Sequence, residues 1–502
     1  MNSYLSLKSG SDIRGTAVTT ANSDIELTDE VVFKITVAFC KWLEEKGYNG
    51  KRIAVGHDSR ISAERIKKQV INGLAQFDKE IYDCSFASTP AMFMTTVDAG
   101  CIASVQITAS HHPYDKNGLK FFTADGGLNP EDIERILILA EMPFECKNTN
   151  PCIISADYMS VYAERLKNMI KEGVNSSENY DKPLEGFKIV VDAGNGVGGF
   201  YATDVLAPLG ADITGSQFLD KDGMFPNHIP NPENKDAMKS VCNATVNNKA
   251  DLGIIFDTDV DRAGCVDENG KEINRNRLVA LASLIALENC KGGTIVTDSV
   301  TSTGLTDFIC KELGGVHMRF RRGYRNVINK QLELEKSGVL CPLAMETSGH
   351  AAFKENFYLD DGAYLVTKIV IKMAQLGKEG KKLDSLISSL KEPAEALEIR
   401  FKINENDFKK YGLKVIEELE KYAESNDDWR IADDNYEGIR IYFDDEKTKG
   451  WLLLRLSVHD PIMPLNIESD VLGGNKRIAE KFYSFIKKYD KLDLSVIERI
   501  LE

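Results

Sequence analysis

The chain has 502 residues, of which 43% are hydrophobic, so it can bury several cores and should divide into about three or four domains. Its 62 basic and 77 acidic residues give a net charge of −15, which argues against a general nucleic-acid-binding surface. Its apolar runs fall short of the ~18 residues that a membrane span needs, and Met1–Gly15 lacks the apolar core of a signal peptide.

A helix is expected over Asp29–Lys46, as part of the core scaffold. Thr28 precedes it as a capping residue, acidic residues fill its first turn, and Gly47 ends it. Apolar residues recur on one helical face, namely Ile35, Phe39 and Leu43.

Strand-like apolar runs alternate with such helical patterns, which is typical of α/β layers. Each of these runs ends near Asp, Gly or Ser, so each end is a candidate loop site. Four of the runs are Arg52–Val55, Lys188–Val191, Leu252–Phe256 and Thr294–Thr297.

The segment Thr108–Pro113 brings a hydroxyl and two imidazoles together after an apolar run that ends at Val105, and Lys120 follows ten residues after Ser110. A serine at the end of a buried strand is well placed to carry a phosphoryl group, provided that a base or a cation activates it. His111 and Lys120 are the candidates for that activation. The alternative is a local turn capped by proline, with Lys120 solvated.

The segment Gly194–Gly199 fits the Gly-x-Gly-x-x-Gly pattern of a dinucleotide site. The acidic residue expected at the end of the next strand is not clearly placed, because that run ends around Gly215–Gln217. We therefore favour a tight turn from strand to helix over a dinucleotide site.

Three carboxylates follow the run Leu252–Phe256 at alternate positions: Asp257, Asp259 and Asp261. In a loop bent away from strand geometry they can converge on one hard cation. Mg²⁺ is the natural occupant because it keeps an open position for a phosphate oxygen. A solvated acidic turn is disfavoured, since three carboxylates this close repel one another unless a cation neutralises them.

Two rival sites share these residues. An EF-hand calcium loop places Glu268 at its twelfth position, but Arg262 stands where that loop needs glycine, and a strand precedes it instead of a helix. An aspartyl-phosphate phosphatase would have a strand followed by Asp-x-Asp with valine or threonine at the fifth position, where this chain has Asp261. The preceding strand is consistent with such a phosphatase, whereas Asp261 at the fifth position is not.

A later loop is suited to a polyol. Glu346, Ser348 and His350 follow the run Leu343–Met345 and offer an acceptor, a hydroxyl and an imidazole for sugar hydroxyls.

Near the C-terminus, Arg455 and Ser457 follow the run Trp451–Leu454. An arginine and a hydroxyl side by side at a strand end can hold a phosphate in bidentate fashion. The alternative is an ordinary alternating strand with both side chains exposed.

In this order, the four loops resemble those of the alpha-D-phosphohexomutase superfamily, the phosphoglucomutase and phosphomannomutase enzymes, over nearly the whole chain. Three more segments resemble family signatures, namely Gly10–Gly15, Val55–Arg60 and Asp222–Glu233. The resemblance implies three similar mixed α/β domains and a smaller α+β C-terminal domain around a central cleft. Rises in polarity suggest their bounds, and we expect domains over 1–178, 179–290, 291–392 and 393–502.

The resemblance also implies a role for each loop. Ser110 matches the serine that carries the phosphoryl group, and the metal ligands it implies are Ser110, Asp257, Asp259 and Asp261. Lys120 and His111 are the candidate acid and base, with Arg14 and Arg262 beside the transferring group. As a base, Lys120 needs a pKa well below ~10.4, and we expect neighbouring cations to lower it. The residues expected to bind substrate are Glu346, Ser348, His350, Gly323, Arg325, Arg455, Ser457 and His459.

The phosphate loop departs from the family pattern Arg-x-Ser-Gly-Thr-Glu-Pro, since Val458, His459 and Asp460 precede proline here. His459 could replace the threonine hydroxyl as a phosphate donor, with a pH dependence that threonine lacks. The segment Arg322–Arg325 is also more basic than expected and could supply a further phosphate contact.

The resemblance implies an isomerase that interconverts hexose 1-phosphate and hexose 6-phosphate, of glucose or mannose, through phosphorylated Ser110 and a bound 1,6-bisphosphate. The implied cofactors are Mg²⁺ and the hexose 1,6-bisphosphate as activator. The expected partner is a small-molecule sugar phosphate, with no nucleic acid and no membrane. Glucosamine phosphate as substrate, an aspartyl-phosphate phosphatase and a sensor without turnover stay open, as do monomer and homodimer. Ten scattered cysteines without a Cys-x-x-Cys pair favour a cytoplasmic protein.

Overall fold

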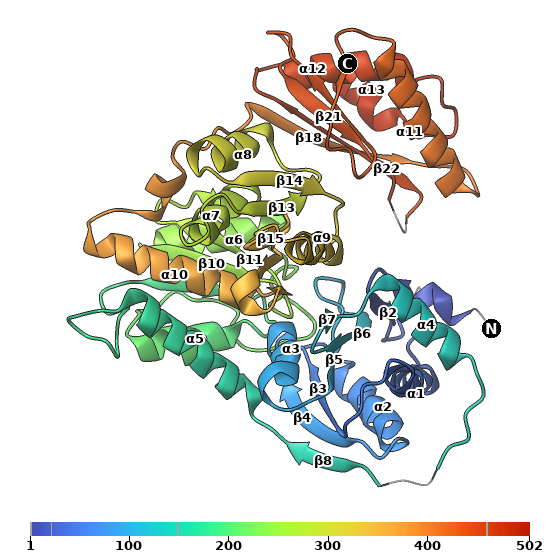
Figure 1. Ribbon diagram of the computed structural model, residues 1–502, viewed down its shortest axis with the longest axis vertical. Helices are drawn as coiled ribbons and strands as arrows, with labels where there is room; N and C mark the ends of the chain where they lie inside the picture. The colour runs from blue at the N-terminus through green and yellow to red at the C-terminus, as the bar shows by residue number, and fades with distance from the viewer. Residues whose placement is uncertain (1–2, 22, 148–149, 458–459) are drawn as a thin grey trace. The chain divides into compact units, whose positions relative to one another are not determined.

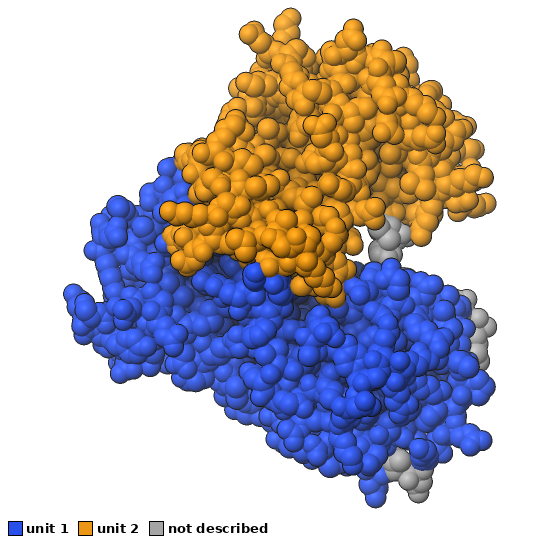
Figure 2. Space-filling model, viewed as in Figure 1, with its two compact units in different colours: residues 1–286, 348–388 blue, residues 287–347, 389–502 orange. Residues whose placement is uncertain are grey.

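The structure is a computed structural model that describes residues 3–21, 23–147, 150–457 and 460–502. It divides into two compact units, residues 1–286 with 348–388 (unit 1) and residues 287–347 with 389–502 (unit 2), coloured separately in Figure 2. Figure 1 labels those helices and strands for which there is room.

Unit 1 begins with a mixed sheet of eight strands in the order β1-β2-β6-β5-β3-β4-β8, with β7 paired to β6 (Figure 1). β5, β3, β4 and β8 run parallel, whereas β6 is antiparallel to both β2 and β5. The strands are β1 (Lys8–Ser9), β2 (Asp12–Thr16), β3 (Arg52–His57), β4 (Glu80–Phe86), β5 (Ala103–Ile107), β6 (Lys116–Thr123), β7 (Gly126–Gly127) and β8 (Cys152–Ser155). The helices are η1 (Tyr4–Leu7), α1 (Asp29–Glu45), α2 (Ala63–Ala75), α3 (Thr89–Asp98), α4 (Pro130–Ala140) and α5 (Tyr158–Val174).

Helix α1 agrees with its prediction to within one residue. The Thr28 hydroxyl caps it by accepting a hydrogen bond from the Val31 N–H. The predicted apolar face is buried in the core of this sheet, and its residues are Ile35, Phe39 and Leu43. The rings of Phe39 and Phe121, on β6, lie 4.3 Å apart between centroids. The helix is therefore core scaffold, as expected.

Strand order brings the polar loops of this sheet together. β3 and β5 are parallel neighbours, so the loops that follow them lie at the same edge of the sheet. β6 returns antiparallel to β5 and sets Lys120 opposite Gln106. The predicted strand Arg52–Val55 and the run that ends at Val105 correspond to β3 and β5.

The second sheet of unit 1 has the order β12-β11-β10-β9, with β9 and β10 parallel and the other pairs antiparallel. Its strands are β9 (Ile189–Asp192), β10 (Leu252–Phe256), β11 (Ala263–Asp267) and β12 (Glu272–Ile273), and its helices are η2 (Tyr201–Leu206), η3 (Ala207–Leu209), α6 (Lys235–Asn247) and α7 (Asn276–Leu287). The later part of unit 1 contains β16 (Ala351–Phe353), η5 (Lys354–Asn356), β17 (Leu359–Asp360), α10 (Gly362–Lys378) and η6 (Leu383–Ile387).

The glycine-rich segment after β9 is a tight turn, as expected. A Cβ atom at Gly196 would lie 2.5 Å from the Thr258 carbonyl oxygen, and one at Gly199 would lie 2.3 Å from the Leu219 carbonyl oxygen. Close approach of backbone segments thus accounts for these two glycines.

Unit 2 contains a parallel and an antiparallel sheet. The parallel strands β14 (Val316–Phe320), β13 (Thr294–Asp298) and β15 (Leu343–Met345) lie side by side, with helices α8 (Thr303–Asp307), η4 (Phe308–Glu312) and α9 (Tyr324–Lys336). The antiparallel sheet has the order β18-β22-β21-β20-β19. Its elements are β18 (Glu395–Lys402), α11 (Phe408–Glu424), β19 (Arg430–Ile431), β20 (Ile439–Phe443), β21 (Gly450–Leu454), β22 (Ile462–Ser469), α12 (Gly474–Ile486) and α13 (Ser495–Leu501).

The C-terminal helices share one core with the antiparallel sheet, to which α11, α12 and α13 contribute Val415, Phe482 and Ile497. The predicted fold class is confirmed: mixed α/β layers come first, and the chain ends in an α+β domain of different topology. The predicted domain boundaries and the central cleft stay predictions. Within the described residues, no helix combines the length and the apolar character needed to cross a membrane.

Candidate functional site

Ser110 lies in the loop after β5, with a left-handed backbone (φ +50°) and a side chain that is almost fully buried. Its Oγ donates a hydrogen bond to Asp257 Oδ2 at 2.8 Å and accepts one from Arg262 Nη2 at 2.9 Å. His111 Nδ1 lies 3.3 Å from the same oxygen. The structure therefore brings the predicted phosphoryl carrier, the acidic loop and Arg262 together.

The acidic loop is buried, not solvated. Asp257, Asp259 and Asp261 follow β10, all three are fully inaccessible to solvent, and one ligand oxygen from each lies within 4.8 Å of the others. The solvated acidic turn is thus wrong. A strand precedes the loop and another, β11, follows it, which an EF-hand does not have.

The buried carboxylates of this loop favour the binding of a cation. Burial raises the pKa of Asp257 well above its ordinary value, and the charge of Asp261 raises it further. Burial also opposes ionisation of Asp261, but Lys120, His350 and Arg262 outweigh it and hold the pKa of Asp261 well below its ordinary value. A cation bound at this loop would offset the repulsion between its carboxylates.

The donor set fits Mg²⁺. Asp259 Oδ1 and Asp261 Oδ1 are buried and accept no hydrogen bond from any residue that the structure describes. Carboxylate oxygens are the ligands that a hard divalent cation prefers, and these two atoms are available for it.

Lys120 is buried on β6, so the alternative of a solvated lysine is wrong. Its Nζ donates to Asp261 Oδ2 and lies 3.4 Å from Asp259 Oδ2. The neighbours that these contacts identify are carboxylates of the acidic loop, whereas cations were expected.

The two imidazoles of the serine loop are neutral at physiological pH. Burial, and then Arg262, hold the pKa of His111 far below its ordinary value, and His111 Nδ1 lies 2.6 Å from Arg262 Nη2. Burial and Arg14 lower the pKa of His112 to about 4. Arg14 itself, on β2, donates to Asp12 Oδ2 at 2.8 Å.

The loop predicted to read sugar hydroxyls is divided between the two units. Its unit 1 part sets His350 Nδ1 3.0 Å from Ser348 Oγ and His350 Nε2 3.6 Å from Asp261 Oδ1. Asp360 joins His350 and Asp261 in a second cluster of potential metal ligands, and burial raises its pKa to about 7. The position of His350 beside the acidic loop was not expected from the sequence.

The unit 2 part contains Glu346, which is buried and accepts a hydrogen bond from the Gly323 N–H at 2.6 Å. Gly323 has φ +114° and precedes α9, which begins one residue before Arg325. The structure therefore joins two of the predicted substrate-binding residues directly.

Arg455 follows β21, and its Nη1 lies 4.0 Å from Glu437 Oε1. The other oxygen of Glu437 accepts hydrogen bonds from Ser299 Oγ at 2.6 Å and from the Arg322 N–H at 3.1 Å. Ser457 Oγ accepts from the Asp460 N–H at 3.2 Å. His459 and Val458 lie outside the described residues. Arg455 is buried, so an exposed alternating strand is wrong for this residue.

Sequence reasoning missed the roles of three residues. Arg60, within a family signature, donates to the backbone of the serine loop. Thr89, which starts α3, donates to Asp259. Glu437 links Arg455 to the loop after β13. A polar residue at a strand end or helix start was the available signal for the first two, and Glu437 had none.

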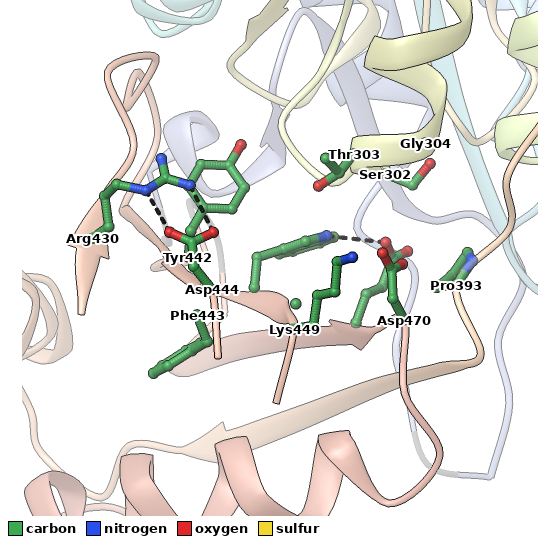
Figure 3. A pocket seen from close by; sticks show the side chains of 13 residues that line it. Ser302, Thr303, Gly304, Pro393, Arg430, Tyr442, Phe443, Asp444, Lys449 and Asp470 are labelled. Carbon is green, nitrogen blue, oxygen red and sulfur yellow. Dashed lines mark hydrogen bonds and ion pairs between the residues drawn. The ribbon is translucent and has the colours of Figure 1, made fainter. Parts of the chain in front are cut away.

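Unit 2 also contains a cavity of about 280 Å³ (Figure 3). Arg430 and Asp444 form an ion pair at its wall, with Nε and Oδ2 2.8 Å apart, and Lys449 and Asp470 also line it. None of the predicted site residues that the structure describes lines it, so we assign it no part in the chemistry.

Three sequence families match the chain in order. They are "Phosphoglucomutase/phosphomannomutase, alpha/beta/alpha domain I" over residues 6–141, domain II over residues 160–270 and domain III over residues 274–393. The phosphoglucomutase of Neisseria gonorrhoeae is 30% identical over 95% of this chain and 95% of its own. The phosphomannomutase/phosphoglucomutase of Pseudomonas syringae is also 30% identical, over 95% of this chain and 94% of its own.

Solved structures agree. A crystal structure of a phosphoglucomutase/phosphomannomutase family protein from Burkholderia thailandensis has a TM-score of 0.78 at 25% identity, over 97% of this chain and 98% of that chain. The open form of parafusin from Paramecium has a TM-score of 0.71 over 99% of this chain and 95% of that chain, and at 14% identity it supports the fold alone. With the family matched over most of its length, the chain belongs to the phosphoglucomutase/phosphomannomutase family and is a phosphohexomutase.

Proposed function

We propose that this phosphohexomutase interconverts hexose 1-phosphate and hexose 6-phosphate, of glucose or mannose, with Ser110 as the phosphoryl carrier. The observation that carries the proposal is the position of Ser110 Oγ, 2.8 Å from Asp257 Oδ2 and 2.9 Å from Arg262 Nη2. A hydroxyl between a potential metal ligand and a guanidinium is suited to hold a phosphoryl group and to release it.

In the first half-reaction, phosphorylated Ser110 gives its phosphoryl group to the free hydroxyl of a bound hexose phosphate. The bond from Ser110 Oγ to phosphorus breaks while the bond from the sugar oxygen forms; the sugar hydroxyl loses its proton to a base, and the freed Ser110 Oγ takes up a proton. The product is the hexose 1,6-bisphosphate. After this intermediate turns over in the site, its other phosphoryl group returns to Ser110 Oγ, which gives up its proton, and a proton returns to the freed sugar oxygen.

Lys120 and His111 are the groups proposed to move this proton. His111 is a candidate because its Nδ1 lies 3.3 Å from Ser110 Oγ. Lys120 pairs with Asp261 and Asp259 and is the proposed proton donor. Arg14 and Arg262 are proposed to stabilise the charge on the transferring group.

Mg²⁺ is the proposed cofactor, held by Asp257, Asp259, Asp261 and an oxygen at Ser110. When bound, it supplies positive charge that offsets the charge developing on the phosphoryl group. The four residues are close enough together for this role.

The remaining predicted residues are proposed to bind the sugar and its other phosphate. Glu346, Ser348 and His350 would contact hydroxyls that both orientations of the substrate present. The proposed phosphate-binding residues are Gly323, Arg325, Arg455, Ser457 and His459. A cleft between four domains, with the boundaries given above, is part of this proposal.

Two measurements test the proposed function. Intact mass and peptide mapping of the purified chain should find an addition of about 80 Da on Ser110. In coupled assays with trace glucose 1,6-bisphosphate, glucose 1-phosphate and mannose 1-phosphate should turn over, glucosamine 1-phosphate should be poorer, and Ser110→Ala should abolish turnover. Phosphate release that survives Ser110→Ala but not Asp257→Asn would instead indicate an aspartyl-phosphate phosphatase.

A further inference from the structure

Arg60 binds the backbone of the loop that carries Ser110 and does not contact the Ser110 hydroxyl. It lies in the loop after β3, and its side chain is buried. Its guanidinium donates to four backbone carbonyl oxygens of one loop: Nη2 to Ser110 and, at 2.6 Å, to His112, and Nη1 to Pro113 at 2.6 Å and Lys116 at 2.8 Å. The proposed chemistry gives this residue no role.

Asp58 acts, through Thr108, on the backbone N–H of Ser110. Its Oδ2 accepts a hydrogen bond from Thr108 Oγ1 at 2.6 Å, and that hydroxyl accepts one from the Ser110 N–H at 2.9 Å. Its Oδ1 accepts from the Arg60 N–H at 3.0 Å. The peptide groups before and after Ser110 are therefore both fixed, one through Thr108 and one through Arg60.

The serine needs this support because its backbone is strained. Ser110 has φ +50°, a left-handed conformation that is unfavourable for residues other than glycine. Such a conformation persists only where the surroundings over-determine it. Relaxation of φ would turn the Ser110 side chain away from Asp257 and Arg262.

The chemistry of Arg60 suits this task better than that of lysine. Its planar fork donates in fixed directions, so one side chain can serve four carbonyls, whereas an ammonium is a point charge on a flexible stem. The Phe225 ring, whose centroid lies 5.3 Å from the guanidinium carbon, closes off one face of the group. Gly223 approaches the loop that carries Arg60, and a Cβ atom there would lie 2.4 Å from the Ser59 carbonyl oxygen.

We propose that Arg60, with Asp58 and Thr108, is a positioning residue for phosphoryl transfer: it holds the backbone of Ser110 so that Oγ keeps facing Asp257 and Arg262. This inference rests on the proposed role of Ser110. Arg60 acts through the backbone of another residue and does not touch the reacting atoms.

The test is Arg60→Lys in the full chain, which keeps the positive charge and loses the planar guanidinium with its fixed donor directions. A displacement of the nucleophile of about 1 Å can cost about 100-fold, so we expect kcat to fall by that order while KM changes little. In Arg60→Ala, millimolar guanidinium chloride should restore part of kcat. Arg65 is the matched control, because it also donates to backbone carbonyls, those of Ala17 at 2.9 Å and Leu27 at 3.0 Å, and contacts none of the serine loop.

A folded Arg60→Lys with wild-type kcat overturns the proposal, as does an equal loss of kcat in Arg65→Lys, which would indicate a general structural effect. If Arg60→Lys does not fold, Thr108→Val replaces it: a fall in kcat with KM retained supports the proposal, and unchanged kcat overturns it. Ser110→Ala, assayed in parallel, separates the two hypotheses, because wild-type turnover there would reject the phosphoserine mechanism whatever Arg60→Lys does.

Discussion

Thr89 contacts Asp259 twice. The Thr89 N–H donates to the Asp259 carbonyl oxygen at 2.9 Å, and the Thr89 hydroxyl donates to Asp259 Oδ2. Both residues are buried, and Asp259 Oδ1 accepts no hydrogen bond from the described part of the chain. The start of α3 therefore fixes the orientation of Asp259 and leaves one of its oxygens available for a cation.

We expect Thr89→Val, which keeps the shape and removes the hydroxyl, to weaken Mg²⁺ binding. Loss of a partner that orients a metal ligand typically costs at least about tenfold in affinity, so the Mg²⁺ concentration for half-maximal activity should rise by that factor. Thr96→Val is the control on the same helix, because the Thr96 hydroxyl bonds to the Phe93 carbonyl oxygen at 2.7 Å and is not at the acidic loop. Equal Mg²⁺ dependence in both variants would contradict the prediction.

Local patterns account for the features that the sequence predicted well. The bounds of α1 follow from a capping residue and an apolar stripe, and β10 matches a continuous apolar run residue for residue. The approach of Ser110 to Asp257 followed from the family resemblance, which assigns both residues to one site. The signals for α1 and β10 are contained in contiguous residues, so no knowledge of tertiary contacts is needed to find them.

The contacts that were missed depend on residues far apart in the chain. Thr89 and Asp259 are separated by 170 positions, and nothing near either residue indicates the other. The partners of Lys120 depend on how β6 pairs with β5 and where the acidic loop lies, so cations were expected where carboxylates are found. The loop around His350 reads as a sugar site in isolation, and only tertiary packing sets its imidazole beside Asp261.

Lys120 compensates the buried carboxylates, so its removal should couple stability to Mg²⁺. In Lys120→Met the acidic loop loses a buried partner, and breaking a buried ion pair from one side costs about 3–5 kcal/mol. We expect the variant to unfold at markedly lower temperature in EDTA and to regain more stability from Mg²⁺ than the unchanged chain does, because the ion replaces the missing charge.

Thermal denaturation with and without Mg²⁺ checks this prediction. Lys116→Met, on the same strand but with a partly exposed side chain paired to Glu26, is the control and should show the ordinary Mg²⁺ response. If Mg²⁺ raised the melting temperature of Lys120→Met no more than that of the control, the Lys120 ammonium and Mg²⁺ would not compensate the same carboxylates.

Gly223 permits a close backbone contact, so a methyl group there should destabilise unit 1. In Gly223→Ala the Cβ would lie 2.4 Å from the Ser59 carbonyl oxygen and 2.5 Å from the Ile61 nitrogen, and the segments would have to move apart at a cost of about 1–3 kcal/mol. Urea denaturation should show a lower midpoint. Gly127→Ala, whose Cβ would meet only the Phe122 ring at 3.5 Å, should leave the midpoint nearly unchanged, and a similar loss in both variants would show that the close contact at Gly223 is not its cause.

Glu468 should make the stability of unit 2 depend on pH. Burial raises its pKa from about 4.5 to about 7, although Arg440 and the Trp451 N–H, at 3.1 Å, favour its charged form. The folded chain keeps a proton on this carboxyl up to about pH 7, whereas the unfolded chain releases it near pH 4.5. Folding therefore takes up a proton between these pH values, and the free energy of unfolding falls as pH rises through them.

Glu468→Gln keeps an acceptor for Trp451 and cannot titrate. Relative to the unchanged chain, it should therefore gain stability as pH rises through this window, by about 3 kcal/mol at most. Denaturation at several pH values measures the difference, with the exposed Glu446→Gln as control. Parallel curves for the unchanged chain and Glu468→Gln would show that this carboxyl does not titrate there.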